Sequence, residues 1–390
     1  MAEQTSIPLI QVANKRYKVL TESQNGQYES FSLESEVTGK DLPTTPDEIA
    51  FLRGKEIIVL DSVKSGKGRT AQNDFCSNVI EPIFHQLQIS ARIIRTYSQE
   101  SVAQHAQSLA ATNPTTIVIF LSGDTTISEF INNLNQSCTD SSQKPSLWLL
   151  PLPFGTGNAW TTSLEIQCPV TAFGKFLQNK LSPKTFPLYK AIFPNQFEIV
   201  FFIILSIGFH ANLLHLCEQH RFHNLGVEKF RIAAQEILES YKLDYPLIIP
   251  GQSSPSNFAY FALINTPHLE KTYKPSPKSD PLKSELHVLG YSAALTKPEL
   301  IEKIMKGYST KKGDDISADG VTYKPFASDF DITFDQQASS ASKNAFEICC
   351  DGHLLNMIEL QQEGADFDGR IKIRFLDQYS SFDLKVLTIV

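Results

Sequence analysis

The chain has 390 residues, of which 42% are hydrophobic and 20% charged, and it carries a formal net charge of −7. This composition is typical of a globular protein rather than a disordered one, and the length favours two domains. A nucleic-acid-binding protein usually carries a basic surplus, so the acidic balance argues against that class.

The cysteines and the apolar runs bear on the cellular compartment. The six cysteines form no Cys-x-x-Cys pair, so we interpret them as reduced thiols of a cytoplasmic protein. The longest apolar run, 199–209, is about half of the roughly 20 residues that a membrane-spanning helix needs, and fits a strand buried on both faces. We therefore expect no transmembrane segment, and any contact with an intracellular membrane should be peripheral.

Residues 1–53 are polar and mixed, and we expect a polar N-terminal extension with one hairpin. From there to residue 187, apolar strand-like runs alternate with segments of helical spacing. The expected strands are 56–60, 92–96, 116–121 and 147–152, and the expected helices are 71–88, 99–111 and 126–136. This alternation predicts a parallel sheet with helices on both faces, as an α/β nucleotide-binding lobe over 54–187. Ligands of such sheets bind beyond the carboxyl ends of the strands.

The pattern changes after residue 187, where strands with polar turns surround one clear helix, 225–242. The expected strands are 188–194, 197–208, 257–265, 285–290, 331–334, 345–350 and 354–360. These predict a C-terminal antiparallel β-sandwich lobe over 188–390, whose last strands could return to the first lobe. Aromatic side chains of this lobe either line a cavity for a lipid tail or pack as ordinary core: Phe193, Phe197, Phe201, Phe202, Phe258 and Phe261.

The loop after the expected strand 116–121 reads Ser122-Gly123-Asp124 and opens a helix. Its amides could point at an anion, and a carboxylate beside a bound phosphate can accept a proton from an attacking hydroxyl or position a metal ion. The alternative is that Asp124 caps the helix 126–136. Spacing alone leaves both interpretations open.

Two further loops follow strand ends. At Pro153–Asn158, Gly155 and Gly157 allow close approach of the backbone to a ligand, although a tight strand-to-helix turn would need them as well. The segment is no dinucleotide fingerprint, because Trp160 stands where the third glycine would be, and the chain contains no Walker loop. The basic loop 64–69 could close over a triphosphate or be a solvated turn.

Together these loops resemble the catalytic domain of the diacylglycerol kinase-type lipid kinases. The family has a Ser-Gly-Lys turn, matched by 65–67, and a Gly/Ser-Gly-Asp-Gly loop followed by a glutamate, matched by 122–124 and Glu129. Its third motif, Pro-x-Gly-Ser/Thr-Gly-Asn, is matched fully by 153–158. The resemblance covers about 54–360. Within the superfamily, the leading serine of the second motif and the segments 163–164, 206–209 and 225–231 are most similar to sphingosine (long-chain base) kinases.

The resemblance implies a two-lobed enzyme that uses ATP and Mg²⁺ in the cleft between its lobes to phosphorylate a lipid hydroxyl, most simply that of a sphingoid base. Diacylglycerol and ceramide are the alternative substrates. By the resemblance, Asp124 is the general base, Glu129 and Asn212 bind substrate, and no metal ligand is assigned. The implied nucleotide-binding residues are Ser65, Gly66, Lys67, Thr96, Ser122, Gly123, Thr125, Thr126, Gly155, Thr156, Gly157, Asn158, Lys229, Arg231, Asp351 and Gly352.

The chain departs from the family at several positions. Thr125 replaces a glycine, and a β-branched residue would be strained there if the position needed a positive φ. His353 replaces a glutamate, Asn212 replaces the aspartate that reads the sphingoid head group, and Ser62-Val63 replaces Asn-Pro. These departures leave open a catalytically impaired relative that binds lipid or nucleotide. Chemistry like that of NAD kinases shares the second loop but fits the third motif less well.

A zinc site is a further candidate, because cysteine and histidine gather within a short stretch. Their spacing matches no structural zinc pattern, so we assign no metal there. The residues are Cys217, His220 and His223.

Overall fold

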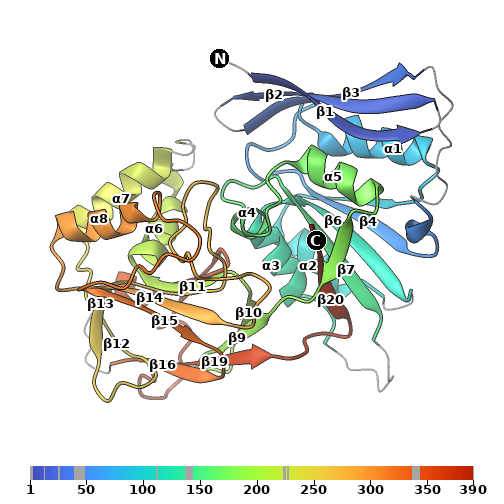
Figure 1. Ribbon diagram of the computed structural model, residues 1–390. Helices are drawn as coiled ribbons and strands as arrows, with labels where there is room; N and C mark the ends of the chain where they lie inside the picture. Colours follow the sequence, from blue (N-terminus) through green and yellow to red (C-terminus); the bar gives the residue numbers. More distant parts are fainter. Residues whose placement is uncertain are drawn as a thin grey trace. The chain divides into compact units, whose positions relative to one another are not determined.

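The computed structural model describes residues 3–12, 14–24, 27–38, 49–110, 113–136, 144–222, 225, 228–335 and 343–389. The chain divides into two compact units. Unit 1 is Met1–Phe186 with Gln378–Val390, and unit 2 is Pro187–Asp377 (Figure 1). Cys138, His223 and Gly226, which entered the sequence analysis, lie outside the described residues.

Unit 1 is built on a six-stranded sheet in the order β5-β4-β6-β7-β20-β8. The first five are parallel to one another, and β8 runs antiparallel to β20. The strands are β4 (Glu56–Ser62), β5 (Arg92–Thr96), β6 (Thr115–Ser122), β7 (Ser146–Pro153), β8 (Leu181–Lys184) and β20 (Asp383–Ile389). The predicted α/β lobe is confirmed, and a C-terminal strand completes its sheet.

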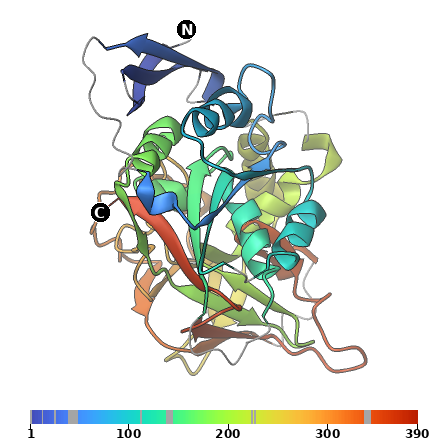
Figure 2. The same ribbon diagram turned by 90° about the vertical axis from the view of Figure 1, so that its right-hand side faces the viewer.

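Helices cover both faces of this sheet (Figures 1 and 2). They are the 3₁₀ turn η1 (Ala50–Leu52), the π-helical turn η2 (Cys76–Ile80), α1 (Glu81–Gln86), α2 (Gln99–Gln107), α3 (Asp124–Asn132), α4 (Ala159–Ser163) and α5 (Pro169–Leu177). Figure 2 shows α2 and α3 on one face, and α1 and α5 on the other. Helix α2 begins with a capping box, in which Ser98 accepts from the amide of Ser101 while the Ser101 hydroxyl accepts from the amide of Ser98.

The N-terminal residues form a three-stranded antiparallel sheet, one strand more than the hairpin expected from the sequence. Its strands are β1 (Glu3–Val12), β2 (Lys15–Gln24) and β3 (Gln27–Val37). One face buries Leu9, Val19 and Phe31, and the Phe31 ring centroid lies 5.0 Å from that of Phe75. The Gln178 side chain donates to the Leu9 carbonyl at 2.8 Å. This sheet therefore packs on the rest of unit 1 rather than extending from it.

Unit 2 is an antiparallel, β-rich structure, as the sequence predicts. Its 11-stranded sheet runs β10-β9-β19-β16-β12-β13-β11-β17-β18, with β14 and β15 added beside β13. The strands are β9 (Leu188–Ile192), β10 (Glu198–Phe201), β11 (Ile204–Gly208), β12 (Tyr245–Ile248), β13 (Ser256–Ile264), β14 (Leu286–Ser292), β15 (Val321–Phe326), β16 (Phe330–Phe334), β17 (Glu347–Cys350), β18 (His353–Asn356) and β19 (Arg370–Leu376).

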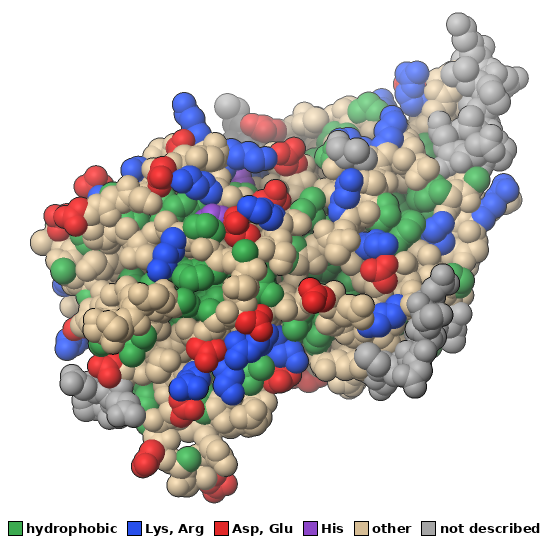
Figure 3. All heavy atoms as spheres, turned by 60° about the horizontal axis from the view of Figure 1, so that its bottom comes forward, with side chains coloured by type: hydrophobic (Ala, Val, Ile, Leu, Met, Phe, Trp, Pro, Cys, Tyr) green, Lys and Arg blue, Asp and Glu red, His purple; other side chains and the backbone are tan. Residues whose placement is uncertain are grey.

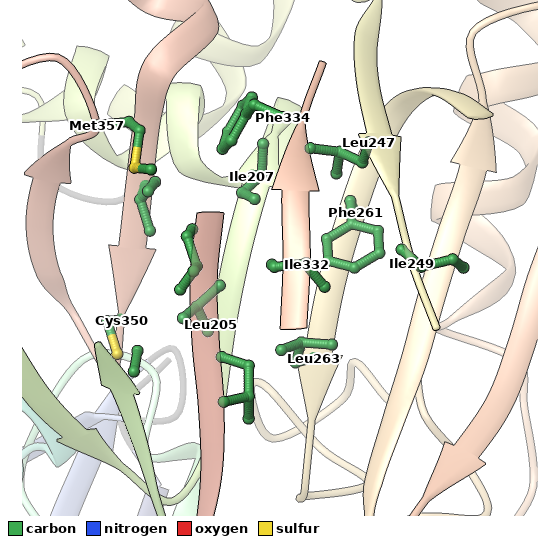
Figure 4. Close-up of a cluster of buried hydrophobic side chains, with 14 of the residues drawn as sticks. Leu205, Ile207, Leu247, Ile249, Phe261, Leu263, Ile332, Phe334, Cys350 and Met357 are labelled. Atoms are coloured by element: carbon green, nitrogen blue, oxygen red, sulfur yellow. The ribbon is translucent and has the colours of Figure 1, made fainter. Parts of the chain in front are cut away.

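The inward side chains of these strands form one apolar core (Figure 4). Leu205, Ile207, Phe261 and Ile332 are fully buried in it. Of the aromatic side chains considered for a lipid cavity, four belong to this core, one is buried beside it and Phe197 is 40% exposed. The interpretation as ordinary core therefore holds for the buried phenylalanines.

The segment 197–208 was predicted as one strand, and that prediction is wrong because the segment forms two strands, β10 and β11. The chain turns at Phe202 and Ile203, so that β10 pairs with β9 while β11 pairs with β13 and β17. The physical reason lies far along the chain. The carboxylate of Asp351 accepts three backbone N–H groups, those of residues 202, 203 and 204, at 2.7–3.1 Å. An apolar run cannot reveal a break that depends on a partner so distant in sequence.

The helices of unit 2 are α6 (Phe209–Cys217), α7 (Glu228–Ser240) and α8 (Lys297–Lys306), with 3₁₀ turns η3 (His220–Phe222) and η5 (Lys343–Phe346). No helix among the described residues is both long and apolar enough to cross a bilayer. Cysteines 76, 168, 217, 349 and 350 are free thiols.

Candidate active site

Three strand-end loops of unit 1 meet backbone to backbone. A Cβ atom at Gly155 would stand 2.4 Å from the Cα of Gly123, and a Cβ at Gly66 would stand 2.7 Å from the Phe154 carbonyl oxygen. Gly66 also has φ +63°, a left-handed conformation that favours glycine. These glycines are thus required by contact between the loops after β4, β6 and β7. Because these three strands are parallel, the loops lie at the same carboxyl edge of the sheet.

Asp124 is the first residue of α3 and joins two of these loops. Its Oδ2 accepts from the Ala159 amide at 2.6 Å and its Oδ1 from the Trp160 amide at 3.3 Å. The side chain therefore caps α4. The capping alternative from the sequence had named α3, the helix that Asp124 itself begins, and it is wrong in that respect. Burial raises the pKa of Asp124 to about 6, against the lowering effect of the two amides.

Thr125 does not strain the backbone. It lies in the first turn of α3 and does not belong to the residues with positive φ. Gly123 before it is extended, with φ −94° and ψ 178°. The strain considered from the sequence is therefore not present, because the helix begins at Asp124 and position 125 takes right-handed helical angles. Next in the turn, the Thr126 hydroxyl lies 3.4 Å from that of Ser62.

Asn158 fixes the shape of the third loop. It adopts a left-handed conformation, with φ 54° and ψ 47°. Its Oδ1 accepts from the Gly155 amide and its Nδ2 donates to the Gly155 carbonyl, both at 2.8 Å. This side chain closes the turn on itself, whereas Thr156 is exposed at the tip. The Asn158 amide is used within the turn, so Thr156 is the residue of this loop whose side-chain polar group can reach a ligand.

A buried ion pair that the sequence analysis missed holds the loops together. Arg69 Nε donates to Asp61 Oδ1 at 3.0 Å, and the two side chains are 8% and 0% exposed. The same guanidinium donates to the Leu121 carbonyl at 2.8 Å and lies 4.7 Å from the Phe154 ring centroid. Arg69 thus contacts the ends of β4 and β6 and the third loop. Desolvation raises the pKa of Asp61, while Arg69 lowers it.

One signal in the sequence could have found this pair. Asp61 is a carboxylate at the end of an otherwise apolar strand, and a charge in such a place requires a buried partner. Arg69, eight residues later in the adjoining loop, is within reach.

The first loop is a tight turn in which the amide of Ser65 donates to the Ser62 carbonyl at 2.9 Å. Its lysines differ in surroundings. Lys67 pairs with Glu29 of β3, whereas Lys64 is exposed and has no ion pair with any described residue. Lys64 is therefore the cation of this loop that could meet a phosphate.

Thr96, at the end of β5, is 1% exposed, and its hydroxyl has no hydrogen-bond partner among the described residues.

In the second loop, Ser122 is buried and its hydroxyl donates to the Gly123 carbonyl at 3.1 Å. Glu129 lies further along α3, where its carboxylate accepts from Asn133 at 2.8 Å. Burial raises the pKa of Glu129. Ser122 therefore stabilises the second loop, and Glu129 stabilises the end of α3.

Of the residues expected in unit 2, Asp351 has a clear structural part. Asp351 and Gly352 have φ 47° and 88°, and they form the turn between β17 and β18. The Asp351 carboxylate is buried and holds the β10–β11 turn through its three amide contacts. His353 follows, and burial lowers its pKa, which favours the neutral imidazole. The late Asp-Gly motif is therefore a fold determinant of unit 2.

Asn212 lies in a buried polar network of unit 2. Its Nδ2 donates to the Asn344 carbonyl and to Glu347 Oε2, each at 2.7 Å, while Tyr245 donates to its Oδ1 at 2.5 Å. Asn212 is fully buried, but the Glu347 side chain is 17% exposed. Burial raises the pKa of Glu347, and the hydrogen bond from Asn212 and nearby His215 oppose that rise. Sequence analysis named the amide and missed the carboxylate bound to it.

The two basic residues expected to clamp phosphate lie on α7. Lys229 has its Nζ 3.8 Å from Glu218 Oε1, and Arg231 pairs with Glu228, which raises the pKa of Arg231. Both therefore form ion pairs with acidic side chains of unit 2.

The loops of unit 1 fit nucleotide phosphates better than they fit a lone metal ion. At the loop contacts a Cβ would collide with the neighbouring loop, so the loops meet through backbone, whose amides are donors that suit phosphate oxygens. Among the described residues, no group of three or more His, Cys, Asp or Glu could hold a metal. Mg²⁺ usually binds through one or two carboxylates together with nucleotide phosphates and water, and Asp124 offers such a carboxylate.

The charges at the surface are mixed. On the face shown in Figure 3, Lys and Arg side chains are interspersed with Asp and Glu rather than gathered into one field. That face therefore offers no continuous basic surface.

Comparison with known proteins gives a family and a fold. Residues 56–185 match the family model of the diacylglycerol kinase catalytic domain. No curated protein matches the chain. Three similar solved structures are described as diacylglycerol kinases of Bacillus anthracis strain Sterne, two of them provisionally. They have TM-scores of 0.57, 0.55 and 0.55 and identities of 15%, 16% and 15%, and each alignment covers 86% of this chain and 98% of the other.

At this level of identity the structural likeness concerns the fold, and nothing in it distinguishes sphingosine kinases from other members. The matched segment holds all three loops and Asp124. Residues 56–185 are therefore similar to the catalytic domain of diacylglycerol kinases, the superfamily that the motifs predicted.

Proposed function

We propose that the protein is a lipid kinase that transfers the γ-phosphoryl group of ATP to a lipid hydroxyl. The observation that carries this proposal is the convergence of three glycine-bearing loops around Asp124 in unit 1. When bound, ATP supplies the phosphoryl group and Mg²⁺ neutralises charge that develops on it. The backbone of the loops and Lys64 bind the phosphates.

Asp124 suits the part of general base. Each carboxylate oxygen can accept two hydrogen bonds, so the two amide contacts leave lone pairs for a substrate proton. The same contacts hold the carboxylate in one orientation, which lowers the cost of positioning it during reaction. A pKa of about 6 leaves the group mostly ionised at neutral pH, yet basic enough to accept a proton.

The lipid is, in our proposal, a sphingoid base, with diacylglycerol or ceramide as the alternatives. An amine-bearing head group needs a carboxylate partner, and Asn212 cannot provide one. Glu347, bound to Asn212 and partly exposed, supplies that charge in the same network. This arrangement supports a cationic head group over the neutral alternatives.

The test is a phosphotransfer assay with labelled ATP and Mg²⁺. Sphingosine, diacylglycerol and ceramide are offered in separate detergent micelles, and NAD is offered in solution. We expect phosphorylated sphingosine as the main product, and we expect Glu347→Gln to lower the preference for sphingosine over diacylglycerol. Exposed Glu198→Gln is the matched control. A product from NAD alone would overturn the assignment.

A second candidate is a non-catalytic relative that binds nucleotide or lipid. It is favoured by the departures at His353 and Asn212, which remove two family carboxylates. Thermal-shift titration with MgATP separates the two functions, because a ligand at a hundredfold excess over Kd stabilises by about 2.7 kcal/mol. Stabilisation by MgATP without turnover of any lipid would favour this candidate over the kinase.

A further inference from the structure

Helix α8 of unit 2, whose place in the fold Figure 1 shows, carries exposed apolar side chains. Ile301, Met305 and Tyr308 are 41%, 54% and 49% exposed. They recur at i, i+4 and i+7, so they follow one face of the helix and the turn after it. On another side of the helix, Leu300 is 3% exposed and anchors it to unit 2. Single exposed apolar side chains are common, but a stripe of them marks an interaction surface.

The stripe is held rigidly. Thr296 and Glu299 form a capping box at the start of α8, in which the Thr296 amide donates to Glu299 at 2.8 Å. Past the end of the helix, the Tyr308 ring lies 4.8 Å from that of Tyr273, and its hydroxyl donates to Glu270 at 3.2 Å. The surface is therefore preformed, and binding to it would cost little ordering of the backbone.

The segment that carries the stripe is rich in lysine. Between residues 297 and 312 stand five lysines and two glutamates, in a chain whose net charge is −7. None of the five ammonium groups forms an ion pair within 4.0 Å with a described residue, whereas Lys278 and Lys283 of the same unit are paired. The lysines are Lys297, Lys303, Lys306, Lys311 and Lys312.

We propose that segment 296–312 docks unit 2 onto the surface of an anionic bilayer. In this arrangement the apolar stripe enters the head-group region, and the lysine ammonium groups lie over lipid phosphates. The proposal deepens the proposed function by naming the surface through which the enzyme meets its lipid, and it rests on that function in the choice of a bilayer. Charge complementarity argues against a second copy, because a symmetric contact would place these lysines against one another.

The experiment is sedimentation of the full chain with sucrose-loaded vesicles in the absence of ATP. One set contains phosphatidylcholine with phosphatidylserine, and the other contains phosphatidylcholine alone. We expect binding to the anionic vesicles that weakens with salt. Ile301→Ser/Met305→Ser should reduce partitioning at least about tenfold through lost apolar burial. Lys306→Gln/Lys312→Gln should reduce it about 25-fold, because each lysine near an anionic surface contributes about fivefold.

Ile358→Ser is the matched control, since Ile358 is 44% exposed elsewhere in unit 2, and it should bind as the wild type does. The proposal would be overturned if the wild-type protein did not sediment with anionic vesicles. It would also be overturned if both double variants bound those vesicles as strongly as the wild type does. A concentration-dependent dimer, seen by analytical ultracentrifugation, that the Ile301→Ser/Met305→Ser variant loses would overturn it as well. Phosphorylation of lipid in detergent micelles is measured in parallel, so failure of docking is distinguishable from failure of the kinase.

Discussion

Replacing Arg69 by methionine tests how the three loops are held. Arg69→Met keeps an unbranched apolar stem but removes the guanidinium, and it leaves Asp61, which is 0% exposed, without its counter-charge. Oδ2 of Asp61 already has no hydrogen-bond partner among the described residues. Removing one partner of a buried pair typically costs about 3–5 kcal/mol. The variant also loses the contact to the Leu121 carbonyl, so the first and second loops should separate.

The assay is thermal unfolding followed by near-UV circular dichroism, with MgATP affinity measured on the same samples. A unit of about 200 residues shifts its Tm by about 2–4 °C per kcal/mol, so Arg69→Met should lower the Tm of unit 1 by about 6–20 °C. Arg92→Met is the control, because Arg92 is 52% exposed and its pair with Glu56 should contribute less than about 1 kcal/mol.

A double variant separates the cost of an unpaired buried charge from the loss of the contacts that hold the loops. Asp61→Leu/Arg69→Met removes both charges of the buried pair, and it should regain much of the lost Tm without regaining the affinity for MgATP. The reasoning would be refuted if Arg69→Met unfolded at the same temperature as Arg92→Met. It would also be refuted if the double variant were less stable than Arg69→Met alone.

Three further predictions concern the loops and unit 2. Because Asp124 must be ionised to accept a proton, kcat/KM should fall about tenfold per pH unit below pH 6 and level off above it; a flat profile from pH 5 to 8 would contradict this. Gly155→Ala should destabilise unit 1 by about 1–3 kcal/mol and weaken MgATP binding, because its Cβ would meet Gly123, whereas exposed Thr156→Ala should leave the Tm unchanged. Asp351→Asn should lower the stability of unit 2 by at least about 1.5–3 kcal/mol, since one oxygen can no longer accept from the β10–β11 turn; unchanged unfolding of unit 2 in urea would show that the turn does not depend on the charge.

The parallel sheet of unit 1 could be predicted because its strands are buried, β-branched runs separated by helical spacing. Strand β5 was expected at its observed bounds, and β4, β6 and β7 were expected within two residues of theirs. The N-terminal sheet was not predicted in full, because its strands bury one face and read as polar sequence. Strand β20 completes the same sheet by pairing with β7, more than two hundred residues away, and no local pattern carries such a pairing.

The site shows the same limit. The glycines and Asp124 could be identified because motifs place them at strand ends, and the structure brings those loops into contact. The capping partner of Asp124 could not be identified, since α4 is a short helix contributed by another loop. Two contacts of Arg69 were hidden for a related reason: the Leu121 carbonyl and the Phe154 ring belong to another strand and the third loop, which sequence spacing does not bring near Arg69.

The most direct measurement of the central claim compares lipid phosphorylation and MgATP binding in Asp124→Asn. An amide keeps the size of the side chain but cannot accept the substrate proton, so kcat should fall by about 10²–10⁴. MgATP should still bind through the loop backbone and Lys64, with a Kd raised only by the loss of the carboxylate offered to Mg²⁺. Asp383→Asn, which alters a 43% exposed carboxylate of the same unit, is the control and should keep its activity. Full turnover by Asp124→Asn would contradict the assignment of Asp124 as the general base.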